Sequence, residues 1–399
     1  MEGGKNCTAF GRCGGCAHLD VPYKEQLSAK DAVVSELFAG LADASCVRPV
    51  RGMDEPYRYR NKVMSPLVPG RRGKGGRRDV LTGMYAKGTH QVVAADDCLL
   101  ENEVAQRVVR AVASIMKRHG VEPYDEDAGR GFMRHVVVRV GHESGEVLVT
   151  LVTNGDEFPH AKSFSRELVR RVPQVTTVVQ NVNARQTNVV LGEKERVLFG
   201  PGFILDTLCG MSFRVSSQSF YQVNARQTEV LYRTAIDLAR LRGGEAVVDA
   251  YCGTGTIGLV AAGSVPGVRL VGVDSEASSI RDARKNAAHN GVEGAEFVAA
   301  DATEFLRDAA AKGGVARGEG MPTVLFMDPP RAGSTPEFLD AAASLGPDRI
   351  VYISCNPHTQ ARDVRRLLGC GYAIEAVQPV DMFPHTDHIE CVVGLKKGA

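Results

Sequence analysis

The second half of the chain contains a series of short apolar segments, and each of the first four ends in or runs into an aspartate. The first is Val247-Val248-Asp249, and the later ones lead to Asp274, Asp301 and Asp328. Helical stretches separate the segments, which is the alternation that parallel strands and crossover helices produce. Because the carboxyl ends of such strands meet at one edge of a sheet, the acids are expected to lie close together. We therefore predict an α/β domain over residues 211–399, built on a doubly wound sheet.

The expected elements of this domain follow from the same alternation. We expect strands over residues 246–249, 269–274, 295–299, 324–328, 349–353, 373–379 and 391–395, and helices over 256–262 and 277–290 and from residues 335 and 359 onward.

The first strand leads into the turn Cys252-Gly253-Thr254-Gly255, whose Gly-x-Gly spacing lets a backbone pass close to a ligand. Asp274 follows about twenty residues later, where an acid suits ribose hydroxyls, and Asp301 suits an adenine amino group. A dinucleotide dehydrogenase shares the first two signals but explains neither Asp301 nor Asp328-Pro329-Pro330. S-adenosylmethionine is therefore favoured over a nicotinamide cofactor. The alternative to a cofactor site is a tight strand–helix turn with solvated acids at the strand ends. One strand-end acid would fit that interpretation, but four in succession disfavour it.

Cys355 is a candidate nucleophile, because it lies where the apolar strand Val351-Tyr352-Ile353 runs into an Asn-Pro turn. Backbone donors at that turn are expected to lower the pKa of the thiol. Glu390 is a candidate base, since it directly precedes an apolar strand and should be half-buried. For His385 and His388 two interpretations stay equally open, a catalytic role and simple hydrogen bonding in a loop or at a strand edge.

The first half of the chain has a mixed pattern, which we interpret as an α+β region over residues 1–210. Helices are expected over 23–41 and 101–118, with Leu27, Val34, Leu37, Phe38 and Leu41 on the apolar face of the first. Antiparallel strands are expected between about 57 and 93, a strand pair at 136–140 and 147–152, and further strands near 175–179 and 188–191.

Composition excludes several classes of protein. The net charge of +1 gives no overall basic excess, so nucleic-acid binding would depend on local patches. No apolar run is long enough to cross a membrane, and no export signal precedes the cysteines. We expect a cytoplasmic protein without membrane contact, in which clustered cysteines bind a metal rather than form disulfides.

Five motifs in this order resemble the RNA uracil-5-methyltransferases, which form 5-methyluridine in ribosomal and transfer RNA. They are Ser219-Phe220-Tyr221-Gln222-Val223-Asn224, Asp249-Ala250-Tyr251-Cys252-Gly253-Thr254-Gly255, Asp328-Pro329-Pro330-Arg331, Ser354-Cys355-Asn356-Pro357 and Phe383-Pro384-His385-Thr386-Asp387-His388-Ile389-Glu390. The resemblance implies a Rossmann-like, class I S-adenosylmethionine-dependent methyltransferase domain behind an iron–sulfur and RNA-binding region.

The resemblance also implies roles for individual residues. Cys355 would attack carbon 6 of uracil, carbon 5 would then accept a methyl group, and Glu390 would remove the carbon 5 proton. The target base has to leave its stack to reach them. Residues implied to contact S-adenosylmethionine are Gln222, Tyr251, Thr256, Asp274, Asp301 and Asp328, although several relatives carry Asn at the position of Thr256.

Cys7, Cys13, Cys16 and Cys98 supply four thiolates, which suit structural zinc or an iron–sulfur cluster. Spacing alone leaves both open, and four unrelated free thiols are the remaining alternative. The resemblance favours a 4Fe–4S cluster with a structural or RNA-docking role, because methyl transfer moves no electrons.

RNA contacts are expected at Tyr57-Arg58-Tyr59-Arg60-Asn61-Lys62, where aromatic and cationic residues alternate, and at the basic loop 71–78, with Arg134 and Arg139 extending a basic face. A solvated surface loop is an equal alternative for 71–78. Many relatives in the resembling family carry an N-terminal barrel module, which we expect to be missing here because the sequence begins almost at the cluster cysteines. We expect a monomer acting on 23S ribosomal RNA, with a transfer-RNA T-loop uridine as the alternative. A non-catalytic RNA-binding factor is disfavoured, because Cys355 and Glu390 are both present.

Overall fold

The computed structural model describes residues 7–72, 78–315 and 321–398. The chain forms two compact units that alternate along the sequence. Unit 1 comprises Met1–Val21, Glu55–Thr207 and Arg214–Ala225, and unit 2 comprises Pro22–Asp54, Leu208–Phe213 and Arg226–Ala399. The division into domains 1–210 and 211–399 stays a prediction, and residues 22–54 group with the C-terminal part in these units.

Unit 2 is built on a mixed sheet with the strand order β12-β11-β10-β13-β14-β16-β15. Strands β12, β11, β10, β13 and β14 are parallel, whereas β16 pairs antiparallel with both β14 and β15. The strands are β10 (Ala246–Ala250), β11 (Arg269–Asp274), β12 (Glu296–Ala299), β13 (Thr323–Met327), β14 (Arg349–Ser354), β15 (Tyr372–Val380) and β16 (Glu390–Lys397). The predicted α/β alternation is confirmed.

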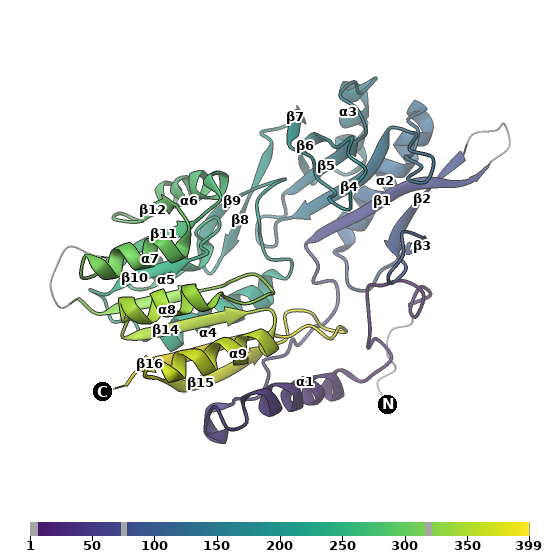
Figure 1. The fold of residues 1–399 in the computed structure, drawn as a ribbon. Coiled ribbons are helices and arrows are strands. Elements are labelled where there is room, and N and C mark those ends of the chain that lie inside the picture. The colour runs from purple at the N-terminus through teal and green to yellow at the C-terminus, as the bar shows by residue number, and fades with distance from the viewer. Residues whose placement is uncertain (1–6, 73–77, 316–320, 399) are drawn as a thin grey trace. The chain divides into compact units, whose positions relative to one another are not determined.

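Helices cover this sheet because the central strands are apolar on both faces. They are α1 (Tyr23–Phe38), α4 (Ala225–Ala239), α5 (Thr256–Ser264), α6 (Ala277–His289), α7 (Ala302–Ala311), α8 (Pro336–Leu345) and α9 (Pro357–Gly369), with a 3₁₀ turn at Ala44–Cys46. Helices α7, α8, α9 and α1 lie side by side in that order (Figure 1). Their apolar side chains join those of the strands in one core, to which α1 contributes Val34 and Phe38.

Helix α1 was correctly expected near residue 23, but its buried face differs from the predicted one. The buried residues are Gln26, Lys30, Val34 and Phe38, which recur every four positions along one side of the helix. Leu27 and Leu37 are only partly buried. Apolar periodicity alone could not identify this face, because half of it is polar.

Unit 1 contains a second mixed sheet, with the strand order β3-β2-β1-β4-β5-β6-β7. Only the β5–β6 pair in this sheet, as far as the structure describes it, is parallel. Its elements are β1 (Lys62–Arg72), β2 (Arg78–Tyr85), β3 (Val92–Ala94), α2 (Glu103–His119), β4 (Met133–Val140), β5 (Val147–Thr153), α3 (Ala161–Arg171), β6 (Val175–Val182) and β7 (Lys194–Phe199). Helices α2 and α3 pack on it around a core of valines, leucines and phenylalanines.

One expected strand of unit 1 is absent. Residues 188–191 form no strand, because Asn183 donates side-chain hydrogen bonds to the carbonyls of Val189 (2.6 Å) and Val190 (3.1 Å) and holds the segment in a loop. The seventh strand is instead β7, which lies farther along the chain. Sequence patterns also missed α3, α4 and the two-stranded sheet of β8 (Phe203–Leu208) and β9 (Met211–Ser216).

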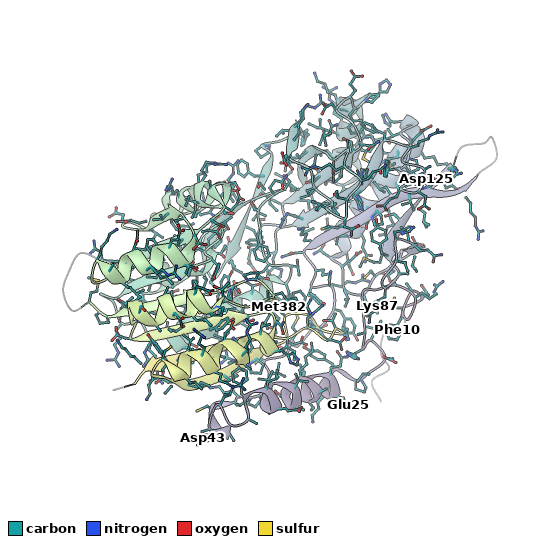
Figure 2. All side chains as sticks on the ribbon, viewed as in Figure 1. Phe10, Glu25, Asp43, Lys87, Asp125 and Met382 are labelled. Atoms are coloured by element: carbon teal, nitrogen blue, oxygen red, sulfur yellow. The ribbon has the colours of Figure 1, made fainter. Side chains whose placement is uncertain are left out.

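Side chains fill both units, as Figure 2 shows; Met382, labelled there, is fully buried at the beginning of the loop between β15 and β16. Within the described residues, no helix combines the length and the hydropathy needed to cross a bilayer.

Gly272 in β11 is required by the packing of its neighbours. A β-carbon there would lie 2.5 Å from the Phe297 ring and 3.1 Å from the Cys252 sulfur. We predict that Gly272→Ala lowers the free energy of unfolding of unit 2 by about 1–3 kcal/mol through overpacking, as measured by urea denaturation.

Gly369→Ala is the matched control, since no described atom outside its own helix would lie within 4 Å of the new methyl group at the end of α9. It should leave stability unchanged or raise it by about 0.5 kcal/mol. Equal losses in the two variants would contradict the packing explanation.

Candidate active site

The turn after β10 has the backbone that a close ligand approach requires. Tyr251, Gly253 and Gly255 all adopt left-handed conformations, with φ of 63°, 55° and 80°. A β-carbon on Gly255 would lie 2.9 Å from the Phe297 ring, so this position also excludes a side chain. A non-glycine residue such as Tyr251 is strained in this region, and such strain concentrates at functional sites.

Asp274 holds this turn from the end of β11. Its Oδ2 atom accepts a hydrogen bond from the Gly253 N–H at 2.9 Å, and its Oδ1 atom accepts one from the Glu276 N–H at 2.8 Å. The strand-end acid and the glycine turn therefore form one local structure, and ribose binding by Asp274 stays a prediction.

Asp249, the acid that ends β10, has a structural role. It is fully buried and accepts a hydrogen bond from the Gly258 N–H at 3.0 Å, which fixes the beginning of α5. Burial raises the pKa of its carboxyl to about 8, with smaller contributions from Asp328 and Asp274. At neutral pH it is therefore largely protonated.

Tyr251 and Asp301 lie near each other on the next part of the edge. The Tyr251 ring packs against the Phe338 ring, with 5.0 Å between centroids. Burial and then the charges of Asp301 and Asp363 raise the pKa of Tyr251. Asp301 is exposed and caps α7 by accepting from the N–H groups of Thr303 and Glu304.

Thr256 and Gln222 have local partners of their own. The Thr256 hydroxyl hydrogen-bonds to the Tyr232 hydroxyl at 2.8 Å. Gln222 belongs to unit 1, where its main-chain carbonyl accepts from the Asn61 side chain at 3.1 Å. The roles of both toward a cofactor stay predictions.

Cys355 occupies the expected turn between β14 and α9. Asn356 caps α9 by accepting from the His358 N–H (3.2 Å), and its Nδ2 atom donates to the Arg331 carbonyl at 3.1 Å. This second bond ties the cysteine turn to the segment Asp328-Pro329-Pro330-Arg331 at the end of β13. The thiol is partly exposed and so accessible to a substrate.

Glu390 reaches the same edge of the sheet from the antiparallel strand β16. Ser354 of β14 pairs with Cys391 of β16, so the next residue on each strand, Cys355 and Glu390, flanks this last pair. Glu390 also pairs with Val380 of β15, and only 4% of its surface is exposed. It is therefore more deeply buried than the predicted half-buried position.

Cys355, Glu390 and Asp328 influence one another electrostatically. Burial raises the pKa of Cys355, and the charges of Glu390 and Asp328 raise it further, while Arg331 and the cysteine's own N–H lower it. Burial, followed by Asp328, raises the pKa of Glu390 well above its usual range. Burial alone raises the pKa of Asp328 to about 7.

The expectation of a lowered thiol pKa is thus wrong, because burial and two carboxylates outweigh the donors at the turn. The arrangement brings a partly exposed thiol, a buried carboxyl group and a strand-end acid to one place. Sequence reasoning missed the proximity of Arg331 to the thiol, although its position directly after Asp328-Pro329-Pro330 placed it at the same sheet edge.

The four N-terminal cysteines group within unit 1. Burial and, to a smaller extent, the charges of Cys98, Cys13 and Cys7 together raise the pKa of Cys16 to about 12, so Cys16 lies within electrostatic range of the other three thiols. Among the described residues, no group of three or more His, Cys, Asp or Glu side chains forms a ready metal site.

Two side chains hold the loop that carries Cys98. The main-chain carbonyl of Cys98 accepts hydrogen bonds from the Arg58 guanidinium and, at 2.6 Å, from Gln106 Nε2. Burial and Glu101 raise the pKa of Cys98 to about 11, while the N–H groups of Leu100 and Glu101 hydrogen-bond to it and lower the pKa. Donors directed at a sulfur atom are typical around cluster-bound thiolates.

The expectation that Arg134 and Arg139 extend a basic surface is wrong, because both side chains are buried. Arg134 and Arg139 are only 5% and 4% exposed, and both donate to main-chain carbonyls, Arg134 to those of Asn183 and Arg185 and Arg139 to that of Ser219. They are structural residues of unit 1 and add nothing to an exposed surface.

Two residues of the stretch Tyr57–Lys62 also bind main-chain carbonyls within unit 1. Arg58 donates to the carbonyl of Cys98, and the Asn61 side chain donates to that of Gln222. In the loop 71–78, Arg71 and Arg78 are exposed, and the side chains of 72–77 lie outside the described residues. RNA contact by either segment stays a prediction.

Comparisons with known proteins agree with this geometry. A family model described as tRNA (Uracil-5-)-methyltransferase matches residues 164–398, which is more than half of the chain. Two curated relatives are RNA methyltransferases that are named as uncharacterized. The one from Halalkalibacterium halodurans is 41% identical over 98% of this chain and 82% of its own length, and the one from Staphylococcus aureus (strain N315) is 40% identical over 97% and 83%.

A solved structure extends the likeness to the fold. The Pyrococcus abyssi tRNA (uracil-54, C5)-methyltransferase, in complex with S-adenosyl-L-homocysteine, superimposes with a TM-score of 0.76 and 26% identity. The match covers 96% of this chain and 86% of that one. The chain therefore belongs to the RNA uracil-5-methyltransferase family, whose model is described as tRNA (Uracil-5-)-methyltransferase.

Proposed function

We propose that this protein methylates carbon 5 of a specific uridine in RNA with S-adenosylmethionine, through a covalent bond between Cys355 and the uracil ring. The observation that carries the proposal is the convergence of Cys355, Glu390 and Asp328 at the ends of β14, β16 and β13. The reaction requires one nucleophile and one base, and this edge of the sheet supplies both.

The residues around the glycine turn fit S-adenosylmethionine. Gly253 and Gly255 leave the turn open to a ligand, and Asp274 and Asp301 place carboxylates beside it that suit ribose hydroxyls and an adenine amino group. Tyr251 and Asp328 complete the set on the same sheet edge, with Thr256 and Gln222 as further proposed contacts. When bound, S-adenosylmethionine supplies an electrophilic methyl group on a positively charged sulfur.

The remaining steps follow from the side chains of the protein. The Cys355 thiolate forms a bond with carbon 6, and the electron pair of the carbon 5–carbon 6 double bond moves into an enolate, which makes carbon 5 nucleophilic. Once carbon 5 carries the methyl group, the Glu390 carboxylate removes its proton. The electrons of that C–H bond restore the double bond, and the sulfur leaves as a thiolate.

The burial of Glu390 suits the last step. A carboxylate whose pKa is raised by desolvation is a stronger base than an exposed one, and it gains more by accepting a proton. Since its pKa and that of Cys355 are both raised, both groups must lose protons before they act. The proposed activity should therefore rise with pH through the neutral range.

The RNA target has two candidates. We propose 23S ribosomal RNA first, because the resemblance connects the four-cysteine arrangement with members that act on ribosomal RNA. The T loop of transfer RNA is the second candidate, and the description of the family model and the likeness to the Pyrococcus abyssi enzyme both favour it.

We also propose that Cys7, Cys13, Cys16 and Cys98 hold a 4Fe–4S cluster, with zinc as the alternative. The grouping of the thiols and the N–H donors at Cys98 support this. Thiols with pKa values of about 11 and 12 are protonated at neutral pH, so metal binding must displace their protons. Such a cluster would link the N-terminal segment to the Cys98 loop and stabilise unit 1.

Cys355→Ala should abolish both methylation and the covalent complex with RNA containing 5-fluorouridine. The fluorine cannot be removed as a cation, so the wild-type protein should remain attached to this RNA. The measurement is a denaturing gel of protein and labelled RNA, together with methyl incorporation. Cys391→Ala, which removes a buried thiol one residue beyond Glu390, is the control and should keep the complex. A Cys355→Ala protein that still methylates RNA would refute the mechanism.

Loss of the gene should remove 5-methyluridine at a single RNA position. A nucleoside-resolved map of ribosomal and transfer RNA from the deletion strain, with and without a plasmid copy of the gene, identifies that position. Loss in 23S RNA supports the first candidate, and loss in the transfer-RNA T loop supports the second. A map without any loss would contradict RNA uridine methylation by this protein.

Protein purified without oxygen should be brown, with broad absorption near roughly 400 nm from thiolate-bound iron. Cys16→Ser should lose iron and acid-labile sulfide, whereas Cys370→Ser, which alters an exposed cysteine of unit 2, should keep both. Metal analysis is the readout. A colourless protein with one equivalent of zinc would overturn the iron–sulfur assignment.

A further inference from the structure

Helix α1 buries two polar side chains where an apolar face is expected. Gln26 and Lys30 are 3% and 5% exposed, and they lie two turns and one turn before Val34, which is fully buried, as is Phe38. Lysine is almost never buried without partners, because removing its charge from water is unfavourable. A polar half-face of this kind points to a task beyond holding the helix against the sheet.

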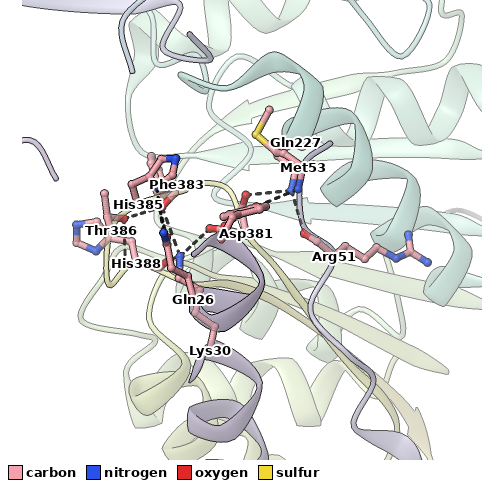
Figure 3. Close-up of polar contacts among 11 residues, drawn as sticks. Gln26, Lys30, Arg51, Met53, Gln227, Asp381, Phe383, His385, Thr386 and His388 are labelled. Atoms are coloured by element: carbon pink, nitrogen blue, oxygen red, sulfur yellow. Dashed lines mark hydrogen bonds and ion pairs between the residues drawn. The ribbon is translucent and has the colours of Figure 1, made fainter. Parts of the chain in front are cut away.

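Lys30 binds both ends of the loop that runs from Asp381 to Ile389 (Figure 3). Its ammonium group lies 2.7 Å from Asp381 Oδ1 and donates to the carbonyls of His388 at 2.9 Å and Phe383 at 3.4 Å. Three acceptors satisfy the three donors of the ammonium group. One buried side chain thus joins the residue after β15 to a residue two positions before Glu390.

Gln26 holds the middle of the same loop. Its Oε1 atom accepts from the His385 N–H at 3.0 Å, and its Nε2 atom lies 3.1 Å from His385 Nδ1. His385 has a φ of 67°, which a non-glycine residue adopts only when its surroundings hold it there. The two hydrogen bonds from Gln26 fix this turn of the chain.

The beginning of the loop is anchored independently. Asp381 accepts from the Tyr23 hydroxyl at 2.7 Å through Oδ2, and its carbonyl accepts from Gln227 Nε2 at 2.9 Å. Its N–H donates to the Arg51 carbonyl at 2.9 Å. Asp381 is therefore a fixed point, to which Lys30 ties the far end of the loop.

We propose that Gln26 and Lys30 are positioning residues for Glu390, acting through this loop on proton removal from carbon 5 of the methylated uracil adduct. The inference rests on the proposed function. The loop enters β16 at Glu390, so the path of its backbone sets the direction from which the carboxylate meets the substrate. Proton transfer demands close geometry, and a displacement of about 1 Å can slow a step about 100-fold.

Cys355 lies in the turn between β14 and α9, and the glycine turn follows β10, whereas Lys30 and Gln26 bind the loop that precedes β16. Attack on carbon 6 and acceptance of the methyl group therefore should not depend on these two residues. The loss of either one should slow the last step selectively, and the methylated RNA should remain attached to Cys355.

The test compares two labels in single-turnover reactions of the full-length protein. The probes are transfer-RNA and 23S transcripts made with [5-³H]uridine, together with S-adenosylmethionine carrying a [¹⁴C]methyl group. Carbon-14 in RNA reports methyl transfer, released tritium reports proton removal, and a denaturing gel reports the covalent complex. Lys30→Met and Gln26→Leu remove the polar groups with little change in volume, and Gln26→Leu keeps the test open if Lys30→Met does not fold.

Both variants should transfer the methyl group within about twofold of the wild-type rate, while tritium release slows about 10- to 100-fold and the methylated complex accumulates. Glu390→Gln, which removes the base itself, should accumulate the same complex. Val34→Ala is the matched control on the same helix face, one turn beyond Lys30, because its apolar side chain packs in the core and makes no hydrogen bond to the loop. It should lower the melting temperature without separating the two labels.

Slowing of both labels by the same factor in Lys30→Met and Gln26→Leu, as in Val34→Ala, would show a merely structural role and overturn the inference. Wild-type release of tritium by both variants would overturn it as well. Failure of the proposed function has a different signature, since the wild-type protein would then form no covalent complex and Glu390→Gln would trap none.

Discussion

The antiparallel pairing of β14 with β16 is the contact on which the candidate site depends. Without it, Cys355 would lie at the end of a parallel strand without the Glu390 carboxyl group beside it. Among the acids of the parallel strands, Asp274 holds the glycine turn and Asp328 lies at the end of β13. The reversed strand introduces Glu390 from the opposite chain direction. It also closes the sheet over that carboxyl group, and burial follows directly from the pairing.

Burial then governs the chemistry of the whole edge. It raises the pKa values of Asp249, Asp328, Glu390 and Cys355, but with different consequences. Asp249 is a structural group that fixes the beginning of α5, whereas Glu390 and Cys355 flank the last residue pair of β14 and β16. Asp249 and Glu390, on strands β10 and β16 of one sheet, thus have different partners, which the motifs that contain them do not reveal.

Much of the second half of the molecule could be predicted from sequence, because parallel strands covered on both faces leave apolar runs that end at one edge. The positions of β10 to β14 and the turn at Cys355 were identified in this way. The face of α1 could not be, since Gln26 and Lys30 find partners more than 350 residues away in the chain. The prediction that Arg134 and Arg139 are exposed failed for a related reason. Their sequence positions do not reveal that main-chain carbonyls accept hydrogen bonds from their guanidinium groups.

The order β14-β16-β15 has a consequence for how the protein is made. Strand β16 follows β15 in the sequence but is inserted between β14 and β15, so that half of the sheet has no continuous ladder until residues 390–397 have been synthesised. Helix α1 is synthesised early, but the loop that Lys30 binds is synthesised more than 350 residues later. The part of the sheet that carries Glu390 therefore cannot close until β16 has been made, and unit 2 acquires its core and the Cys355–Glu390 arrangement together.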